Sequence, residues 1–227
     1  MESLLSMSLF LVVILCSLEC FAIIRTHFFD LKQEEENNCA AYAALDRMKT
    51  DIREAGYGLL LPIRMGIIQG ISEEGGALVF ISREKDIVFL GDLVKGQTWI
   101  PVENTDGIKK GHEVCFHSEN LGEVLRVESV ENNSLVMASP LSADYPHDGS
   151  CMSRLRRVSC YLDHKKNILR RKVNTSPAQP LVENIQDFVF SYEAGGNLLY
   201  IGIHLSSDME KLYECTIYPK NTALARL

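Results

Sequence analysis

The chain has 227 residues, of which 46% are hydrophobic and 23% charged, which is enough apolar material for one folded domain with its own core. Its 30 acidic residues outnumber its 23 Lys and Arg residues, so the formal net charge is −7. This balance disfavours a generic nucleic-acid binder, because an acidic protein repels phosphates at long range. The sequence contains no internal repeat and no long linker.

The first 24 residues form an apolar run, in which Glu2 stands at the head and Glu19 is the only charged residue between Ser3 and Ile24. A helix rising ~1.5 Å per residue over this length would cover roughly a bilayer core. A secretory signal peptide would have a basic start, a shorter apolar core and a small-residue cleavage site, and the run has none of these. Cys20 is a poor lipid-attachment site because Glu19 precedes it. We therefore expect residues 1–24 to be a helix that spans or anchors in a membrane.

Residues 25–56 continue as an amphipathic helix. The segment has no Gly or Pro before Gly56, and its apolar residues recur at alternating steps of four and three. Gly56 is well placed to end the helix in a left-handed cap. We expect one apolar stripe to pack this half of the helix on a globular head, formed by Ala41, Leu45, Met48, Ile52 and Ala55.

Residues 57–227 change to short β-rich runs separated by turn residues such as GG, NN and DG. The runs are ALVFISR, DIVFLGDL, HEVCFHS, GEVLRVESVE, SLVMAS, SRLRRVSCYLD, NILRRKV, DFVFSYE, NLLYIGIHLSS and YECTIYPK. Asn174 to Pro180 is expected to be a mobile loop. One long helix followed by many strands predicts an α+β fold, with the helix packed on an antiparallel β-rich head.

The run ESLLSMSLFLVVIL resembles the N-terminal helix of type IV pilins and of the pseudopilins of type II secretion. In that superfamily a phenylalanine begins the mature chain, and a glutamate at the position of Glu2 is thought to pair with the N-terminal amine of a neighbouring subunit. The basic leader, its glycine and the phenylalanine are absent here, which suggests a truncated start. The first basic residue is Arg25, so the positive-inside rule would place the head in the cytoplasm unless such a leader is missing.

Further fragments resemble PilW-like minor pilins, in the order in which that family shows them. They are RMKTDIREAGYGL, GSCMSRLRRVSCYLD, NILRRKV, PLVENIQDFVFSY and YPKN, and together they cover essentially the whole chain. Cys160 stands where an aromatic residue is commoner, and Lys220 stands in place of the expected arginine.

The resemblance implies a pilin-like fold and a minor pilin that co-assembles through its N-terminal helix, priming or capping a type IV pilus or pseudopilus. The implied partners are other minor and major pilins or pseudopilins, an inner-membrane assembly platform, and a prepilin peptidase acting on the full-length precursor. The implied location is the bacterial inner membrane, with a single pass and a periplasmic head, and then the filament. Whether such a filament would serve motility, DNA uptake or secretion stays open.

Catalytic and cofactor motifs are absent from the sequence. There is no GxSxG, no HExxH, no phosphate-binding GxxxxGK[ST] and no dinucleotide-type glycine fingerprint. The cluster HEVCFH contains zinc-ligand types, but on a strand His112 would point away from Cys115 and His117. We therefore expect no enzyme activity, no metal and no cofactor.

Four cysteines of the β-rich part are candidates for disulfides, namely Cys115, Cys151, Cys160 and Cys215. If CMSRLRRVSCYL forms one unbroken strand, Cys151 and Cys160 face opposite ways and are too far apart to bridge. Bonds from either of them to Cys115 or Cys215 stay open, as do four free thiols.

Basic residues gather in the two neighbouring strand candidates around residues 154–172. A hairpin of these strands could place some of them on one face as a patch for DNA phosphates or for a partner, formed by Arg154, Arg156, Arg157, Arg170, Arg171 and Lys172. The other interpretations are a solvated hairpin face and a complement to the acidic surface of a neighbouring pilin. The DNA interpretation supports an alternative function, a signal-anchored extracytoplasmic binding module.

Overall fold

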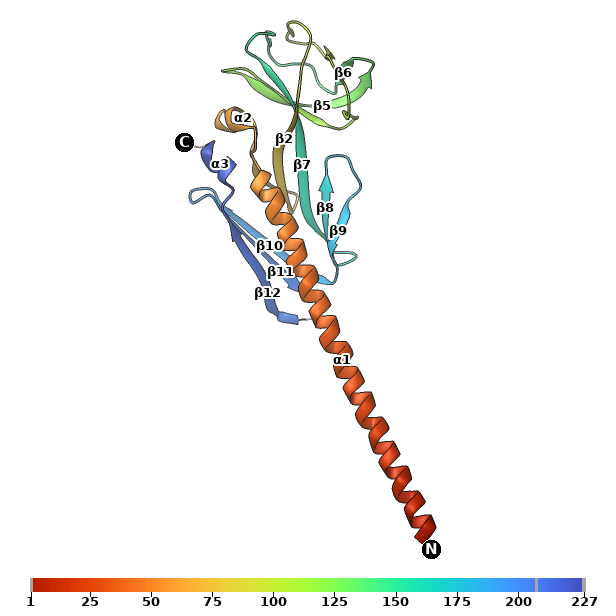
Figure 1. The fold of residues 1–227 in the computed structure, drawn as a ribbon. Helices are drawn as coiled ribbons and strands as arrows, with labels where there is room; N and C mark the ends of the chain where they lie inside the picture. The colour runs from red at the N-terminus through yellow and green to blue at the C-terminus, as the bar shows by residue number, and fades with distance from the viewer. Residues whose placement is uncertain (1, 207, 226–227) are drawn as a thin grey trace. The chain divides into compact units, whose positions relative to one another are not determined.

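The structure is a computed structural model that describes residues 2–206 and 208–225; residues 2–6, 8 and 208–210 are described by their backbone alone. The chain separates into two compact units, Met1–Tyr42 and Ala43–Leu227. Its helices are α1 (Glu2–Glu54), α2 (Leu60–Arg64) and α3 (Lys220–Leu224) (Figure 1).

Helix α1 ends close to the predicted stop. Its last residue is Glu54, and Gly56 has a φ of +75°. This is the left-handed conformation that glycine adopts at low cost, so the prediction for Gly56 is confirmed. The Gly56 amide donates to the carbonyl of Ile81 at 2.7 Å, and the Arg83 amide donates to the carbonyl of Tyr57 at 2.9 Å. The turn after the helix is therefore bonded directly to a strand of the head.

The main sheet of the head is antiparallel and follows the order β1-β2-β7-β4-β5-β6-β3, with β8 and β9 continuing from β7 (Figure 1). Its strands are β1 (Ile71–Glu74), β2 (Ala77–Ile87), β3 (Trp99–Pro101), β4 (Glu113–His117), β5 (Gly122–Glu131), β6 (Ser134–Met137), β7 (Cys151–Asp163), β8 (Ile168–Val173) and β9 (Gln179–Val182). A second antiparallel sheet has the order β10-β11-β12, formed by Ile185–Glu193, Leu198–Leu205 and Asp208–Ile217. The expected α+β class, with one long N-terminal helix and a mostly antiparallel head, is confirmed.

The centre of the main sheet has two different faces. On β2 and β7, Leu78 pairs with Cys160 and Phe80 with Val158, and these side chains share the face that meets the end of α1. The alternate residues Val79, Ile81 and Leu155 lie on the opposite face, in a cluster with Leu59 and Ile68. A separate core fills the part of the head around β3–β6 and is centred on Ile100, Val114, Phe116, Leu135 and Tyr145.

Several elements differ from the sequence expectation. β2 runs on from ALVFISR to Ile87, so DIVFLGDL is not a strand of its own; the rest of it makes only isolated bridges, Phe89 to Val102 and Leu93 to Tyr145. The short strands β1, β3 and β9 were not expected. β9 takes up Gln179 and Pro180 from the end of the expected mobile loop, because it pairs with the edge of β8.

Candidate functional site

The apolar half of α1 presents its side chains to the surroundings. The helix is long and apolar enough to cross a membrane, and none of its most apolar stretch is buried within the described part of the chain. The exposed large side chains include Leu9, Phe10, Leu11, Val12, Val13, Ile14, Leu15, Leu18, Phe21, Ile23 and Ile24. One helix that could span a membrane is therefore present. The backbone of Glu2 belongs to α1, but its side chain lies outside the described residues.

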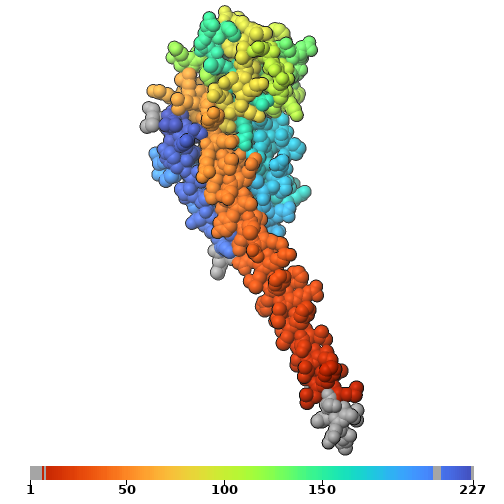
Figure 2. All heavy atoms as spheres, in the orientation of Figure 1, coloured from red at the N-terminus to blue at the C-terminus, as the bar shows by residue number. Residues whose placement is uncertain are grey.

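The last turns of α1 are buried along one side. The stripe residues Ala41, Leu45, Met48, Ile52 and Ala55 are each at most 1% exposed. Ala44 is also buried, whereas Tyr42 is exposed. In Figures 1 and 2 the end of α1 is flanked on one side by β8 and β9 and on the other by β10–β12. This part of the helix is thus a core element of the head.

A buried ion cluster fixes the end of α1 to the main sheet. Asp51 is 1% exposed, and its two oxygens accept hydrogen bonds from Arg171 Nε at 2.6 Å and Arg171 Nη2 at 2.8 Å. Arg156 donates to Asp51 at 2.9 Å and to Glu54 at 2.5 Å. Burial alone would raise the pKa of Asp51, but the hydrogen bonds and charges of Arg171 and Arg156 outweigh burial and hold it below its ordinary value.

The C-terminal segment closes over the same helix end. The Asn221 side chain donates to the carbonyl of Arg53 at 2.8 Å, which satisfies one of the free carbonyls of the last helical turn. The Thr222 hydroxyl donates to Asn197 Oδ1 at 2.8 Å, and Asn197 donates to the Pro219 carbonyl at 2.8 Å. The segments around Asp51, Arg156, Arg171 and Asn221 are far apart in sequence, and they meet around one helix end.

The expected basic patch is not one free surface. Arg156 and Arg171 face α1 and are paired with its carboxylates, while Arg157 and Lys172 point to the other side of the sheet, because adjacent residues of a strand alternate. The other ion pairs are Arg154 with Glu84, Arg157 with Glu74 and Glu113, and Arg170 with Asp163. The pairing of β7 with β8 thus places Arg157, Arg170 and Lys172 on one face and Arg171 on the other, so the six residues do not form a single site, and phosphate binding stays a prediction. The pattern of basic residues did not reveal their acidic partners, which lie up to 120 positions away.

The candidate disulfides are not formed, since all four cysteines of the head are free and lie in the described part of the chain. Cys115 belongs to the cluster beneath α2, whereas Cys160 lies on the opposite face of the sheet, beside Asp51 and Arg171. Cys215 is on β12 of the second sheet, and Cys151 is exposed opposite His117. Burial raises the pKa of both Cys115 and Cys160 to about 12. These two thiols are inert packing groups at neutral pH.

The HEVCFH segment provides no metal centre among the described residues, where no three His, Cys, Asp or Glu side chains converge. Cys115 is fully buried, and His112 is 8% exposed, with its Nδ1 accepting the Lys109 amide at 3.4 Å. Burial is the main cause that lowers the pKa of both His112 and His117.

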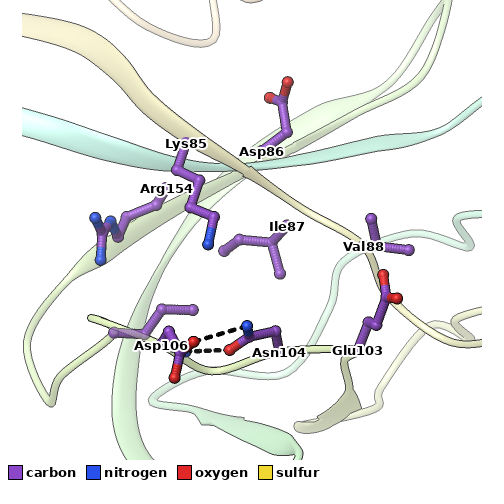
Figure 3. Close-up of a pocket in the computed structure, with 9 residues that line it drawn as sticks. Lys85, Asp86, Ile87, Val88, Glu103, Asn104, Asp106 and Arg154 are labelled. Atoms are coloured by element: carbon purple, nitrogen blue, oxygen red, sulfur yellow. Dashed lines mark hydrogen bonds between the residues drawn. The ribbon is translucent and has the colours of Figure 1, made fainter.

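A polar cavity of about 410 Å³ opens beside the end of β2. Figure 3 shows the Lys85 amine pointing toward Asn104 and Asp106, while Asp86 points away from them. Asn104 and Asp106 bond to each other at 2.6 and 2.8 Å, and Arg154 Nη1 donates to the Gly107 carbonyl at 2.5 Å. Asn104 and Asp106 thus satisfy each other, and none of the side chains that line the cavity is a serine, threonine, cysteine or histidine.

Comparison with known proteins does not assign the chain to a family. No family model matches it, and no curated protein matches it. Among solved structures, the Gp54 tailspike of Acinetobacter baumannii bacteriophage AP22, in complex with a capsular saccharide, is 19% identical with a TM-score of 0.31, covering 33% of this chain and 15% of that one. The tailspike gp49 of Pseudomonas phage LKA1 is 17% identical with a TM-score of 0.27, covering 34% and 14%. The match thus involves about a third of this chain and a seventh of each tailspike, and the similarity is too low to inform fold or function.

Proposed function

We propose that the chain is a PilW-like minor pilin, anchored in the bacterial inner membrane with its head in the periplasm, which co-assembles into a type IV pilus or pseudopilus. Its role is to prime or cap the filament by assembly and not by catalysis. Its partners are other pilin or pseudopilin subunits and the membrane platform that assembles them.

The two unlike halves of α1 carry this proposal. A single helix without interruption is apolar and exposed over its first half and buried along one side at its end. A plain membrane anchor needs no rigid connection to its head, whereas a filament subunit must transmit the position of its core helix to its head. The buried Asp51–Arg171 pair and the Asn221 bond to Arg53 hold the last turns of the helix to the head.

Resemblance of separate fragments becomes more informative when the fragments meet in space. RMKTDIREAGYGL contributes Asp51, the two strands SCMSRLRRVSCYLD and NILRRKV contribute Arg156 and Arg171, and YPKN contributes Asn221. Chance matches to short motifs would be scattered over the head. Here four of the five fragments contribute residues that meet at the end of α1, which supports the proposal.

Glu2 is the residue to which we assign the assembly contact. Placing an ionised carboxylate in hydrocarbon costs about 3 kcal/mol or more of free energy unless the carboxylate is paired. In a bundle of helices, the amine of a neighbouring subunit's N-terminus would neutralise it. This pairing would favour helices that associate in one register.

The test replaces Glu2 and uses Glu19 as its control, because both are acids of the same apolar segment. We expect Glu2→Ala to reach the membrane with a protease-resistant head but to be absent from sheared filaments, while Glu19→Ala co-assembles. Filament incorporation is measured by immunoblot of the sheared fraction against the membrane fraction. Normal incorporation of Glu2→Ala would contradict the assigned role and favour a signal-anchored binding module.

A further inference from the structure

A hollow of about 350 Å³ lies on the face of the main sheet opposite the Asp51 cluster, between the β4–β5 pair and the β7–β8 pair. Its size is at the lower end of the range for ligand pockets, about 300–1,000 Å³, which suits a side chain better than a large ligand. It is lined by Gly111, Glu113, Arg126, Arg157, Ser159, Lys172, Asn174 and Thr175.

Strand register brings these residues together from distant parts of the sequence. Glu113 pairs with Arg126 across β4 and β5, and Ser159 pairs with Lys172 across β7 and β8. The Arg157 amide donates to Asn174 Oδ1 at 2.7 Å, which holds the end of β8 against β7. The walls of the pocket are therefore sheet residues with fixed positions.

The loops at one end of the pocket approach each other closely. Gly111 has a φ of +84°, and a Cβ there would lie 2.9 Å from Thr175 Cγ2. Glycine is thus needed at this position both for its backbone conformation and for the space beside Thr175.

The pocket holds more positive than negative charge. Arg157 contacts the carboxylates of both Glu74 and Glu113, and Glu113 is shared with Arg126 at 3.7 Å. The Arg126 side chain is 66% exposed and is therefore held loosely. Within the described part of the chain, no carboxylate lies within 4.0 Å of the Lys172 ammonium. Arg126 and Arg157 thus share two carboxylates, and the Lys172 ammonium is a third cation without a carboxylate partner among the described residues.

We propose that this pocket binds the carboxylate of an acidic side chain from another protein chain. Arg126, Arg157 and Lys172 supply the cations of its lining, and the Ser159 and Thr175 hydroxyls supply neutral donors. The ion pairs of Arg157 with two glutamates already show that the site suits carboxylates. The inference does not depend on filament assembly, because a signal-anchored binding protein could use the same pocket.

A DNA phosphate backbone fits the site less well. The chain carries a net charge of −7, which repels a polyanion at long range. A single acidic side chain interacts mainly with the excess positive charge in the pocket itself. Duplex binding that depends on electrostatics uses several phosphate contacts, about six to ten in well-studied cases. Here most neighbouring arginines are already paired with carboxylates.

The experiment uses the full chain in a non-ionic detergent and a fluorescent, end-blocked pentaglutamate peptide, with binding followed by anisotropy. Pentaglutamine shows whether binding requires the negative charge of the peptide. Inorganic phosphate shows whether the pocket binds a free oxyanion, and a short DNA duplex shows whether it binds a polyanion. Lys172→Glu and Lys172→Gln remove the spare cation. Lys165→Glu is the matched control, because it makes the same charge change in the turn of the same hairpin outside the pocket.

We expect pentaglutamate to bind and pentaglutamine not to bind. Lys172→Glu should weaken binding at least about fivefold and Lys165→Glu less than about twofold, as expected for a local rather than a general charge effect. Equal weakening by the two reversals would overturn the proposal. So would binding of phosphate or the duplex, with the same dependence on Lys172, in the absence of peptide binding.

Discussion

The carboxylate of Asp51, near the end of α1, accepts two hydrogen bonds from the guanidinium of Arg171 on β8, at 2.6 and 2.8 Å, although the residues are 120 positions apart. Both side chains are nearly inaccessible, with exposed fractions of 1% and 5%. Arg156 adds a second guanidinium to the same carboxylate. These hydrogen bonds hold the last turns of α1 to the sheet. Removal of one partner would leave the other as an unpaired buried charge.

Replacing Asp51 by asparagine should destabilise the head strongly. The variant leaves Arg171 buried without a counter-charge, and breaking such a buried pair typically costs about 3–5 kcal/mol. The free energy of unfolding can be measured by pulse proteolysis in urea, with the protein in detergent. Asp46→Asn is the control, because its pair with Lys49 is exposed and should be worth less than about 1 kcal/mol. Equal effects of the two substitutions would contradict the assigned role of the cluster.

The same carboxylate predicts an acid limit to stability. The pKa of Asp51 is lower in the folded protein than its ordinary value, so the unfolded chain binds a proton more readily. The stabilisation is fully present above the unfolded pKa of about 3.9 and is lost as the pH falls through the folded value. The unfolding free energy, measured from pH 6 to 3 (about the window over which Asp titrates), should decline less steeply in Asp51→Asn than in the wild type.

The two histidines whose pKa is lowered, His112 and His117, should reduce the stability of the protein at a higher pH than Asp51 does. Burial disfavours the protonated forms of His112 and His117, so the unfolded chain takes up their protons first as the pH falls below about 6.5. Removing one of them, as in His117→Gln, should flatten the stability curve between about pH 7 and 5. An unchanged slope in that interval would show that His117 does not contribute.

Replacing Gly70 by alanine should destabilise the head through a steric clash with Thr222, and a second substitution at Thr222 should relieve that clash. A Cβ at Gly70 would lie 2.5 Å from Thr222 Cγ2, so Gly70→Ala must shift either the Thr222 side chain, which bonds to Asn197, or the C-terminal segment that carries it. We expect a loss of about 1–3 kcal/mol, typical of overpacking. Thr222→Ser removes the clashing methyl and keeps the hydroxyl that bonds to Asn197. Failure of the double variant to recover stability would rule out this contact as the cause.

Thiol reactivity should separate the cysteines of the head. Cys151 is exposed, whereas Cys115 and Cys160 are fully buried with a pKa raised to about 12, so neither forms thiolate at neutral pH. Alkylation of the native protein at pH 7.5, about one unit below the ordinary thiol pKa, should label Cys151 and spare the other two until the protein unfolds. Mass spectrometry of the digested protein reads out each site, and equal labelling of all three would show that the packing is different.

The sequence predicted features that depend on local pattern. The long helix, its stop at Gly56, the unbroken strand around Arg154–Asp163 and the mainly antiparallel head all follow from periodicity and turn residues. The stripe on α1 also follows from spacing alone. Short elements such as β1, β3, β9, α2 and α3 could not be predicted, because their few residues take their conformation from the neighbours they pair or pack with.

The sequence did not predict which charges would pair. The basic residues lie close together in sequence, but alternation along the strands places Arg156 and Arg171 on one face and Arg157 and Lys172 on the other. The apolar stripe does not predict the burial of Asp51, although Asp51 lies three residues after Met48 and four before Ala55, next to the stripe. A charged residue at such a position signals a buried partner, but the identity of the partner depends on long-range register.

The most direct test of the filament proposal is proteomic analysis of surface filaments sheared from native cells, compared with the membrane fraction of the same cells. The account predicts peptides from the head in the filament fraction, in a small proportion to the major subunit, and their loss from that fraction in the Glu2→Ala strain. Detection of the chain in the membrane fraction alone, with filaments of normal composition and number when it is deleted, would contradict the account.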